Sequence, residues 1–203
     1  MSKGIKTLLI VVAVIVVIGM GLYSFFGGNY NKIVVLDESV KSQWGQVQNV
    51  YQRRLDLIPN LVATVKGYAA HESEVFTQIA EARSKAGGVM QVSDEVLNNP
   101  ESFKKFQQAQ SELSGALQRL LVVTENYPVL KADANFLALQ DQLEGTENRI
   151  AVERKSFNDV VKSYNVFIKQ FPQSIIANMN GFREKEYFAA DEAASKAPTV
   201  SFQ

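Results

Sequence analysis

The feature that most limits what this chain can fold into is an uncharged run of 22 residues near its N-terminus, from Thr7 to Gly28. At about 1.5 Å per residue, a helix of this length crosses the roughly 30 Å hydrocarbon layer of a bilayer. The run exceeds the roughly 7 to 15 apolar residues of a signal-peptide core, and no small-residue cleavage site follows it. We therefore predict an N-terminal transmembrane anchor over residues 1–28, with residues 7–28 in the membrane, rather than a cleaved signal peptide.

Charges around and beyond this run indicate orientation and partner class. Lys3 and Lys6 cluster tightly before the run, whereas Lys32 and Lys41 are spread out after it. By the positive-inside rule, this favours a cytoplasmic N-terminus and an extracytoplasmic domain at a bacterial inner membrane. The chain beyond the anchor carries 19 basic and 21 acidic residues, so its near-neutral charge argues against nucleic acid as a partner.

After residue 28, apolar residues recur at alternating spacings of three and four, which is typical of helices packed in a bundle. The pattern predicts an all-α fold, with an antiparallel four-helix-type bundle of long helices over residues 29–188. The helices are expected over about residues 30–86, 100–126, 129–171 and 174–180. We expect Pro59 to kink the first helix without ending it, and Gly87 and Gly88 to end it.

The connections between the predicted helices have their own signals. Residues 89–98 are polar and are predicted as a connection, and Asn99 followed by Pro100 and Glu101 has the order of a helix N-terminus. Gly181 is expected to cap the last short helix. Residues 189–203 contain too little apolar surface for a helix and are predicted to be an extended tail, which docks through Val200 and Phe202.

Three charged residues, Arg54, Glu72 and Glu153, fall on apolar positions of the helical repeat. A charge at such a position costs stability unless it is paired, and its best-attested use is to fix the register or number of packed helices. The alternative for Arg54 is that the kink at Pro59 rotates it outward. The sequence leaves both interpretations open.

Long segments of the chain resemble the LemA family of bacterial membrane proteins. They are YQRRLDLIPNLVATVKGYAAHE (51–72), ENYPVLKADANFLALQDQLEGTENRIAVERKSFNDVVKSYN (125–165) and FPQSIIANMNGFREKEYF (171–188). One departure is Phe157, where the family more usually has tyrosine, so a hydroxyl-dependent role is not expected there. The resemblance implies one N-terminal anchor and a helical bundle, and it implies no catalytic residue.

Catalytic and metal-binding patterns are missing from the sequence. The chain has no cysteine and one histidine, His71, whereas a di-metal bundle site needs two Glu-x-x-His pairs. His71-Glu72 fails the H-E-x-x-H zinc motif because position 75 is valine. No G-x-S-x-G sequence or Gly-rich phosphate loop occurs. We predict no enzymatic activity, no metal and no cofactor.

Function is therefore expected to rest on binding. The first hypothesis is a non-enzymatic membrane-anchored scaffold or adaptor of the bacterial cell envelope, acting through contacts with envelope proteins and self-association. The alternative is a peptide- or ligand-binding sensor module gated by the C-terminal tail.

Self-association was expected from the predicted helix lengths. The later helices would be too short to cover a first helix ending at residue 86, which leaves its membrane-proximal part uncovered. The candidate interface of a homo-oligomer comprises Val40, Trp44, Val47, Tyr51 and Arg54.

Overall fold

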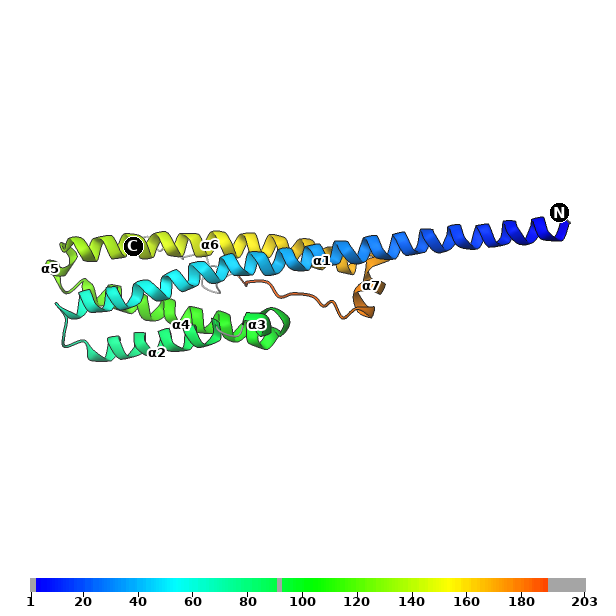
Figure 1. Ribbon diagram of the computed structural model, residues 1–203. Coiled ribbons are helices and arrows are strands. Elements are labelled where there is room, and N and C mark those ends of the chain that lie inside the picture. Colours follow the sequence, from blue (N-terminus) through cyan, green and yellow to red (C-terminus); the bar gives the residue numbers. More distant parts are fainter. Residues whose placement is uncertain (1–2, 91–92, 190–203) are drawn as a thin grey trace, which may run out of the picture. The chain divides into compact units, whose positions relative to one another are not determined.

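The computed structural model describes residues 3–90 and 93–189, and within these ranges the chain is helical with no strand (Figure 1). This confirms the all-α prediction. The chain forms two compact units: unit 1 comprises Met1–Val40 with Lys162–Glu184, and unit 2 comprises Lys41–Val161 with Lys185–Gln203. Val200 and Phe202 of the predicted tail lie outside the described residues.

Unit 1 contains the predicted anchor. Helix α1 (Lys3–Lys66) begins here, and it is the one helix of the described chain that is long and apolar enough to span a membrane. Its most apolar window has a mean hydropathy of 2.8, and none of that window is buried inside the protein. Large aliphatic side chains exposed on every side of a helix are typical of a segment surrounded by lipid.

The predicted first helix, 30–86, is wrong: α1 ends at Lys66, and α2 (Ser73–Met90) follows as the second arm of a hairpin in unit 2. Gly67 begins the break, where helix costs the most backbone entropy. The amides of Tyr68 and Ala69 then bond the Val65 carbonyl at 3.0 and 2.9 Å. The hairpin lets the apolar faces of both arms bury each other. Pro59 lies inside α1, which continues past it as predicted.

Two further local predictions fail and one holds around the next helix. Gly87 and Gly88 do not end α2, which runs to Met90, and α3 (Ser93–Asn98) occupies part of the predicted connection. The predicted start of α4 (Pro100–Thr124) is confirmed, because the Asn99 side chain accepts hydrogen bonds from the amides of Glu101 and Ser102.

The predicted helix 129–171 is also interrupted. It consists of α5 (Pro128–Lys131) and α6 (Ala134–Lys169). Asp133 separates them because its side chain accepts a 2.9 Å hydrogen bond from the Phe136 amide, which is how an N-cap starts a new helix. Helix α7 (Gln173–Met179) lies close to the predicted 174–180, and Gly181 follows it with a φ of 76°.

The core of unit 2 joins four long helices. Its buried side chains come from α1, α2, α4 and α6, with Leu130 from α5 and Ala69 from the turn after α1, and include Ile58, Leu61, Ile79, Leu113, Leu120, Phe136 and Leu143. Figure 1 shows these helices running side by side. The predicted four-helix-type bundle is thus found in unit 2. After Gly181 no further helix is described, and the chain from Phe182 to Ala189 is extended.

Candidate functional site

The predicted interface residues are not exposed. Val40 and Val47 have no accessible surface, and Trp44 and Tyr51 are each 3% exposed within a single chain. The expectation that this part of the first helix lacks a cover was wrong, because it assumed one helix to residue 86. Self-association stays a prediction, but these residues no longer support it.

Aromatic side chains from other parts of the chain bury much of this stretch of α1, around Trp44. Trp44 lies 5.0 to 6.1 Å, between ring centroids, from four phenylalanines. We call these five residues the aromatic cluster: Trp44, Phe103, Phe106, Phe157 and Phe188. Phe157, the departure from the family pattern, fills a fully buried place in it. Such ring contacts are apolar packing and leave no place for a hydroxyl-dependent step.

Phe188 reaches this cluster from the extended segment 185–189, whose main chain is held by side chains of two helices. Asn158 on α6 accepts from the Phe188 amide at 2.9 Å and donates to its carbonyl at 3.0 Å. Gln107 on α4 accepts from the Ala189 amide at 3.1 Å, and Arg154 donates to the Ala189 carbonyl at 2.7 Å. The segment 185–189 is therefore held against α4 and α6 of its own unit by hydrogen bonds from its backbone to side-chain amides and a guanidinium.

Arg54 is directed inward, which contradicts the interpretation that the kink at Pro59 rotates it outward. Its side chain is 1% exposed and donates to Ser114 at 2.9 Å, to Glu147 at 3.0 Å and to the Gln110 side chain. The guanidinium also lies 5.0 Å from the Tyr51 ring centroid. The cation thus ties α1 to both α4 and α6. Whether it also fixes the number of packed helices remains a prediction.

The two other charges on the repeat have different surroundings. Glu153 accepts a 2.6 Å hydrogen bond from Gln43, and Glu72 lies in the turn before α2, 3.4 Å from the Tyr127 hydroxyl. Because α1 has already ended before Glu72, this residue is not on an apolar helix face, and its charge at that position of the repeat is explained.

A groove of about 730 Å³ continues from the bound segment. Its walls are formed by α4 and α6, Arg54 and Tyr51 lie at its base, and Phe188 and Ala189 border it. Four glutamines line it: Gln107, Gln108, Gln110 and Gln118. Its charged side chains are three cations and one anion, namely Arg54, Lys104, Arg154 and Glu147. Amide side chains can donate to and accept from a peptide main chain, so the lining extends the chemistry that already holds Ala189.

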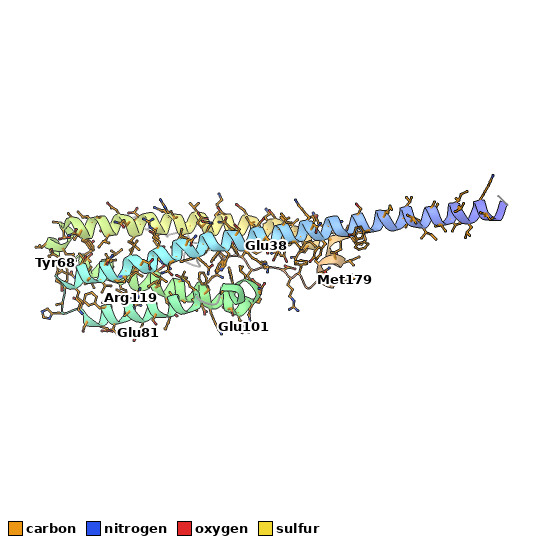
Figure 2. The ribbon with its side chains drawn as sticks, viewed as in Figure 1. Glu38, Tyr68, Glu81, Glu101, Arg119 and Met179 are labelled. Atoms are coloured by element: carbon orange, nitrogen blue, oxygen red, sulfur yellow. The ribbon has the colours of Figure 1, made fainter. Side chains whose placement is uncertain are left out.

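The other polar contact of note in unit 2 lies where the turn after α1 meets the start of α6. The Tyr68 hydroxyl, labelled in Figure 2, donates to Asp133 at 3.0 Å. This bond raises the pKa of Tyr68 above its ordinary value. The Phe136 amide and then the Tyr68 hydroxyl lower the pKa of Asp133. Both shifts move the pKa values further from neutral pH, so the pair stabilises a helix start and is not suited to acid–base catalysis there.

Residues that could hold a metal do not come together in the described part of the chain, where no group of three His, Asp or Glu side chains has suitable geometry. His71 lies exposed in the turn between α1 and α2. The candidate site is therefore the groove with its bound segment.

Sequence reasoning missed Asn158 and Phe188, the pair that docks the extended segment. Phe188 was placed at the last position of the predicted bundle, with no contact assigned to it. One available signal was the run from Phe182 to Phe188, which ends in two aromatic residues and has no helical repeat.

Comparisons with known proteins identify the family of this chain. The LemA family model matches residues 43–202. Magnetosome protein MamQ of Magnetospirillum gryphiswaldense is 27% identical, over 86% of this chain and 69% of that protein. MamQ 2 of Paramagnetospirillum magneticum is 26% identical with the same coverage. Protein LemA of Metamycoplasma hominis is 22% identical, over 93% of this chain and 81% of that protein. Since the family match covers most of its 203 residues, the chain belongs to the LemA family.

Proposed function

We propose that this protein is a non-enzymatic, membrane-anchored scaffold or adaptor of the bacterial cell envelope that acts through protein–protein contacts. One observation carries the proposal: side chains of α4 and α6 hold the main chain of the protein's own segment 188–189, through Asn158, Gln107 and Arg154, beside a groove lined by further amides. Hydrogen bonds to a peptide backbone recognise an extended chain and require no reactive group. One relative is named as a magnetosome protein and another simply as protein LemA, and neither name specifies an activity.

In this proposal residues 7–28 span the inner membrane, the N-terminus is cytoplasmic and unit 2 is extracytoplasmic. Protease added to spheroplasts is expected to remove unit 2 before lysis. Protection until lysis would reverse the orientation while leaving the adaptor role open.

Site-specific photocrosslinking in intact cells tests the adaptor role. Gln108 lines the groove, whereas Gln142 is an exposed glutamine on α6 that does not line it. A photoreactive residue at position 108 is expected to give discrete adducts with envelope proteins or a second copy, and the same residue at position 142 none. Equal adducts at both positions, or none at 108, would contradict an adaptor that works through the groove.

A second candidate, a peptide- or ligand-binding sensor gated by the C-terminal tail, is favoured by the position of the groove beside Ala189. In this version, deleting residues 197–203 from the full chain should raise its affinity for a labelled synthetic peptide of that sequence. A scaffold should keep its assembly and gain no affinity.

Two glycines provide a matched control for that experiment. An added Cβ at either Gly115, which lines the groove, or Gly145, which does not, meets no atom within 4 Å. Gly115→Trp should therefore abolish the gained peptide binding by filling the groove, and Gly145→Trp should leave it unchanged.

A further inference from the structure

Unit 1 exposes a stripe of large apolar side chains beside α7. Phe171 is 83% exposed, Ile175 46% and Met179 80%. Ile175 and Met179, four residues apart, lie along one side of α7, whereas Ile176 and Ala177 on another side are buried, and Phe171 lies in the turn just before the helix. Three neighbouring exposed side chains of this size are unusual on a surface that faces only water.

The segment that carries this stripe has no charge. From Gln170 to Phe182 there are thirteen residues without Asp, Glu, Lys or Arg, and the first charges on either side are Lys169 and Arg183. The α7 backbone is largely satisfied within its own turn, with Asn180 capping onto the carbonyls of Ile176 and Ala177. A surface segment that is uncharged, apolar on its outer side and internally hydrogen-bonded can enter the polar–apolar boundary of a bilayer at little cost.

Contacts within unit 1 fix the segment at the end of the apolar run of α1. Gln173 donates a 3.0 Å hydrogen bond to Asn29, the first residue after Gly28. The Tyr30 and Phe182 rings lie 5.9 Å apart, between centroids. Figure 1 shows α7 beside the blue part of α1, and Met179 is labelled on it in Figure 2.

The same stretch of α1 has the composition of a membrane boundary. Tyr23, Phe25, Phe26 and Tyr30 follow the aliphatic run and are all exposed. Aromatic side chains gather where a transmembrane helix leaves the hydrocarbon, because their rings suit the headgroup level.

We propose that α7 and Phe171 form a second membrane contact, in which Phe171, Ile175 and Met179 insert into the bilayer interface beside the end of the transmembrane segment. The occupant of this surface is lipid rather than a second protein, because the stripe adjoins the one segment that lipid already surrounds. The absence of charge from Gln170 to Phe182 predicts insertion into zwitterionic bilayers without a need for anionic lipid. The inference requires α1 to span the membrane and does not depend on the adaptor function.

Depth-dependent fluorescence quenching in the full-length protein tests this contact. The chain has no cysteine, so Met179→Cys or Phe171→Cys carries one environment-sensitive label. Ser39→Cys is the control, because Ser39 is exposed on α1 in the same unit and lies eleven residues, or about 16 Å of helix, beyond Gly28. Val17→Cys reports whether the span itself lies in the bilayer.

In phosphatidylcholine vesicles containing doxyl-labelled lipid, the labels at 179 and 171 should be blue-shifted and quenched, and the label at 39 should not. Ile175→Asp should reduce quenching at 179 while leaving quenching at 17 unchanged. Quenching at 179 no stronger than at 39 would overturn the proposal, and so would a blue shift without lipid quenching that disappears on dilution, which indicates a second copy. If the label at 17 is not quenched, the span and the α7 contact fail together, with no consequence for the groove.

Discussion

Asn158 binds the main chain of Phe188 with both ends of its carboxamide, donating to the carbonyl at 3.0 Å and accepting from the amide at 2.9 Å. This is the pairing that a neighbouring β-strand would provide, supplied here by a side chain of a helix. It fixes which way the extended segment faces, and so directs the Phe188 ring into the aromatic cluster.

Asn158→Asp should destabilise the protein by about 1 to 3 kcal/mol at neutral pH, because the carboxylate cannot donate to the Phe188 carbonyl and repels it. Thermal unfolding followed by circular dichroism measures this. Asn148→Asp, at an exposed position on α6, controls for the added charge and should change stability little.

The same variant should recover stability in acid. The Phe188 carbonyl raises the pKa of the introduced carboxyl in the folded state, so folding takes up a proton, and stability increases as pH falls through that pKa. Once protonated, the carboxyl can both donate and accept. A difference from wild type that stays constant between neutral pH and pH 4 would show that the donor at this position does not matter.

Phe188→Ala should cost about 3 to 5 kcal/mol, as for other large-to-small changes of a buried phenylalanine. Trp44 is the single tryptophan and contacts the Phe188 ring, so its emission should also shift to longer wavelength. Tyr187→Ala is the control, since Tyr187 is exposed. An unshifted Trp44 emission in Phe188→Ala would mean that the ring does not shield the indole.

Removing one or the other partner of the half-buried ion pair between Arg54 and Glu147 should change stability by unequal amounts. Glu147→Ala leaves the Arg54 cation without its carboxylate at a position 1% exposed, whereas Arg54→Met removes the charge and fills the space with an apolar side chain. Glu147 is 41% exposed, so solvent compensates in part for its loss. We therefore expect Glu147→Ala to lower the free energy of unfolding by about 1 to 3 kcal/mol, which is less than breaking a fully buried pair would cost.

Urea unfolding of both variants measures this difference. Glu147→Ala should be the less stable of the two. Equal or greater loss in Arg54→Met would show that the hydrogen bonds of Arg54 to Ser114 and Gln110 matter more than its charge.

The helical class, the long apolar N-terminal helix and the starts of α4, α5 and α7 could be predicted because they depend on local signals: an uncharged apolar run, a repeat of three and four, and proline near a helix start, as in Asn99-Pro100-Glu101. The break after Lys66 could have been suspected from Gly67 and from Glu72, since an acid on an apolar repeat indicates that the repeat has ended. It was missed because apolar residues resume at the same period in α2, and periodicity alone cannot distinguish a long helix from a hairpin.

The site was harder to predict for a different reason. The pairing of Asn158 with Phe188 joins residues thirty positions apart through a main chain, and backbone recognition leaves no pattern of residue types. The placement of Trp44 depended on the hairpin, so the error in one helix end assigned five buried residues, from Val40 to Arg54, to a supposed interface.

The contact between Tyr68 and Asp133 predicts how stability depends on pH. The pKa of Asp133 is lowered, chiefly by the Phe136 amide and then by the Tyr68 hydroxyl, so its carboxylate is bound more favourably in the folded than in the unfolded state. Its contribution is fully present above the ordinary carboxyl pKa of 3.8 and is lost as pH falls through the lower folded value.

Asp133→Ala should accordingly lower the melting temperature at pH 7 and at pH 5, and its difference from wild type should shrink once the pH falls below the ordinary carboxyl pKa of 3.8. Asp133→Asn keeps an acceptor for the Phe136 amide but has no charge, so it should lose less at pH 7, and its difference from wild type should also shrink in acid, because the group that titrates is the wild-type carboxyl. Tyr68→Phe removes one of the two hydrogen bonds and should fall between wild type and Asp133→Ala at pH 7. Scanning calorimetry of the four proteins at pH 7, 5 and 3 measures these differences. A gap between wild type and Asp133→Ala that persists at low pH would show that the carboxyl contributes as a neutral cap rather than through its charge.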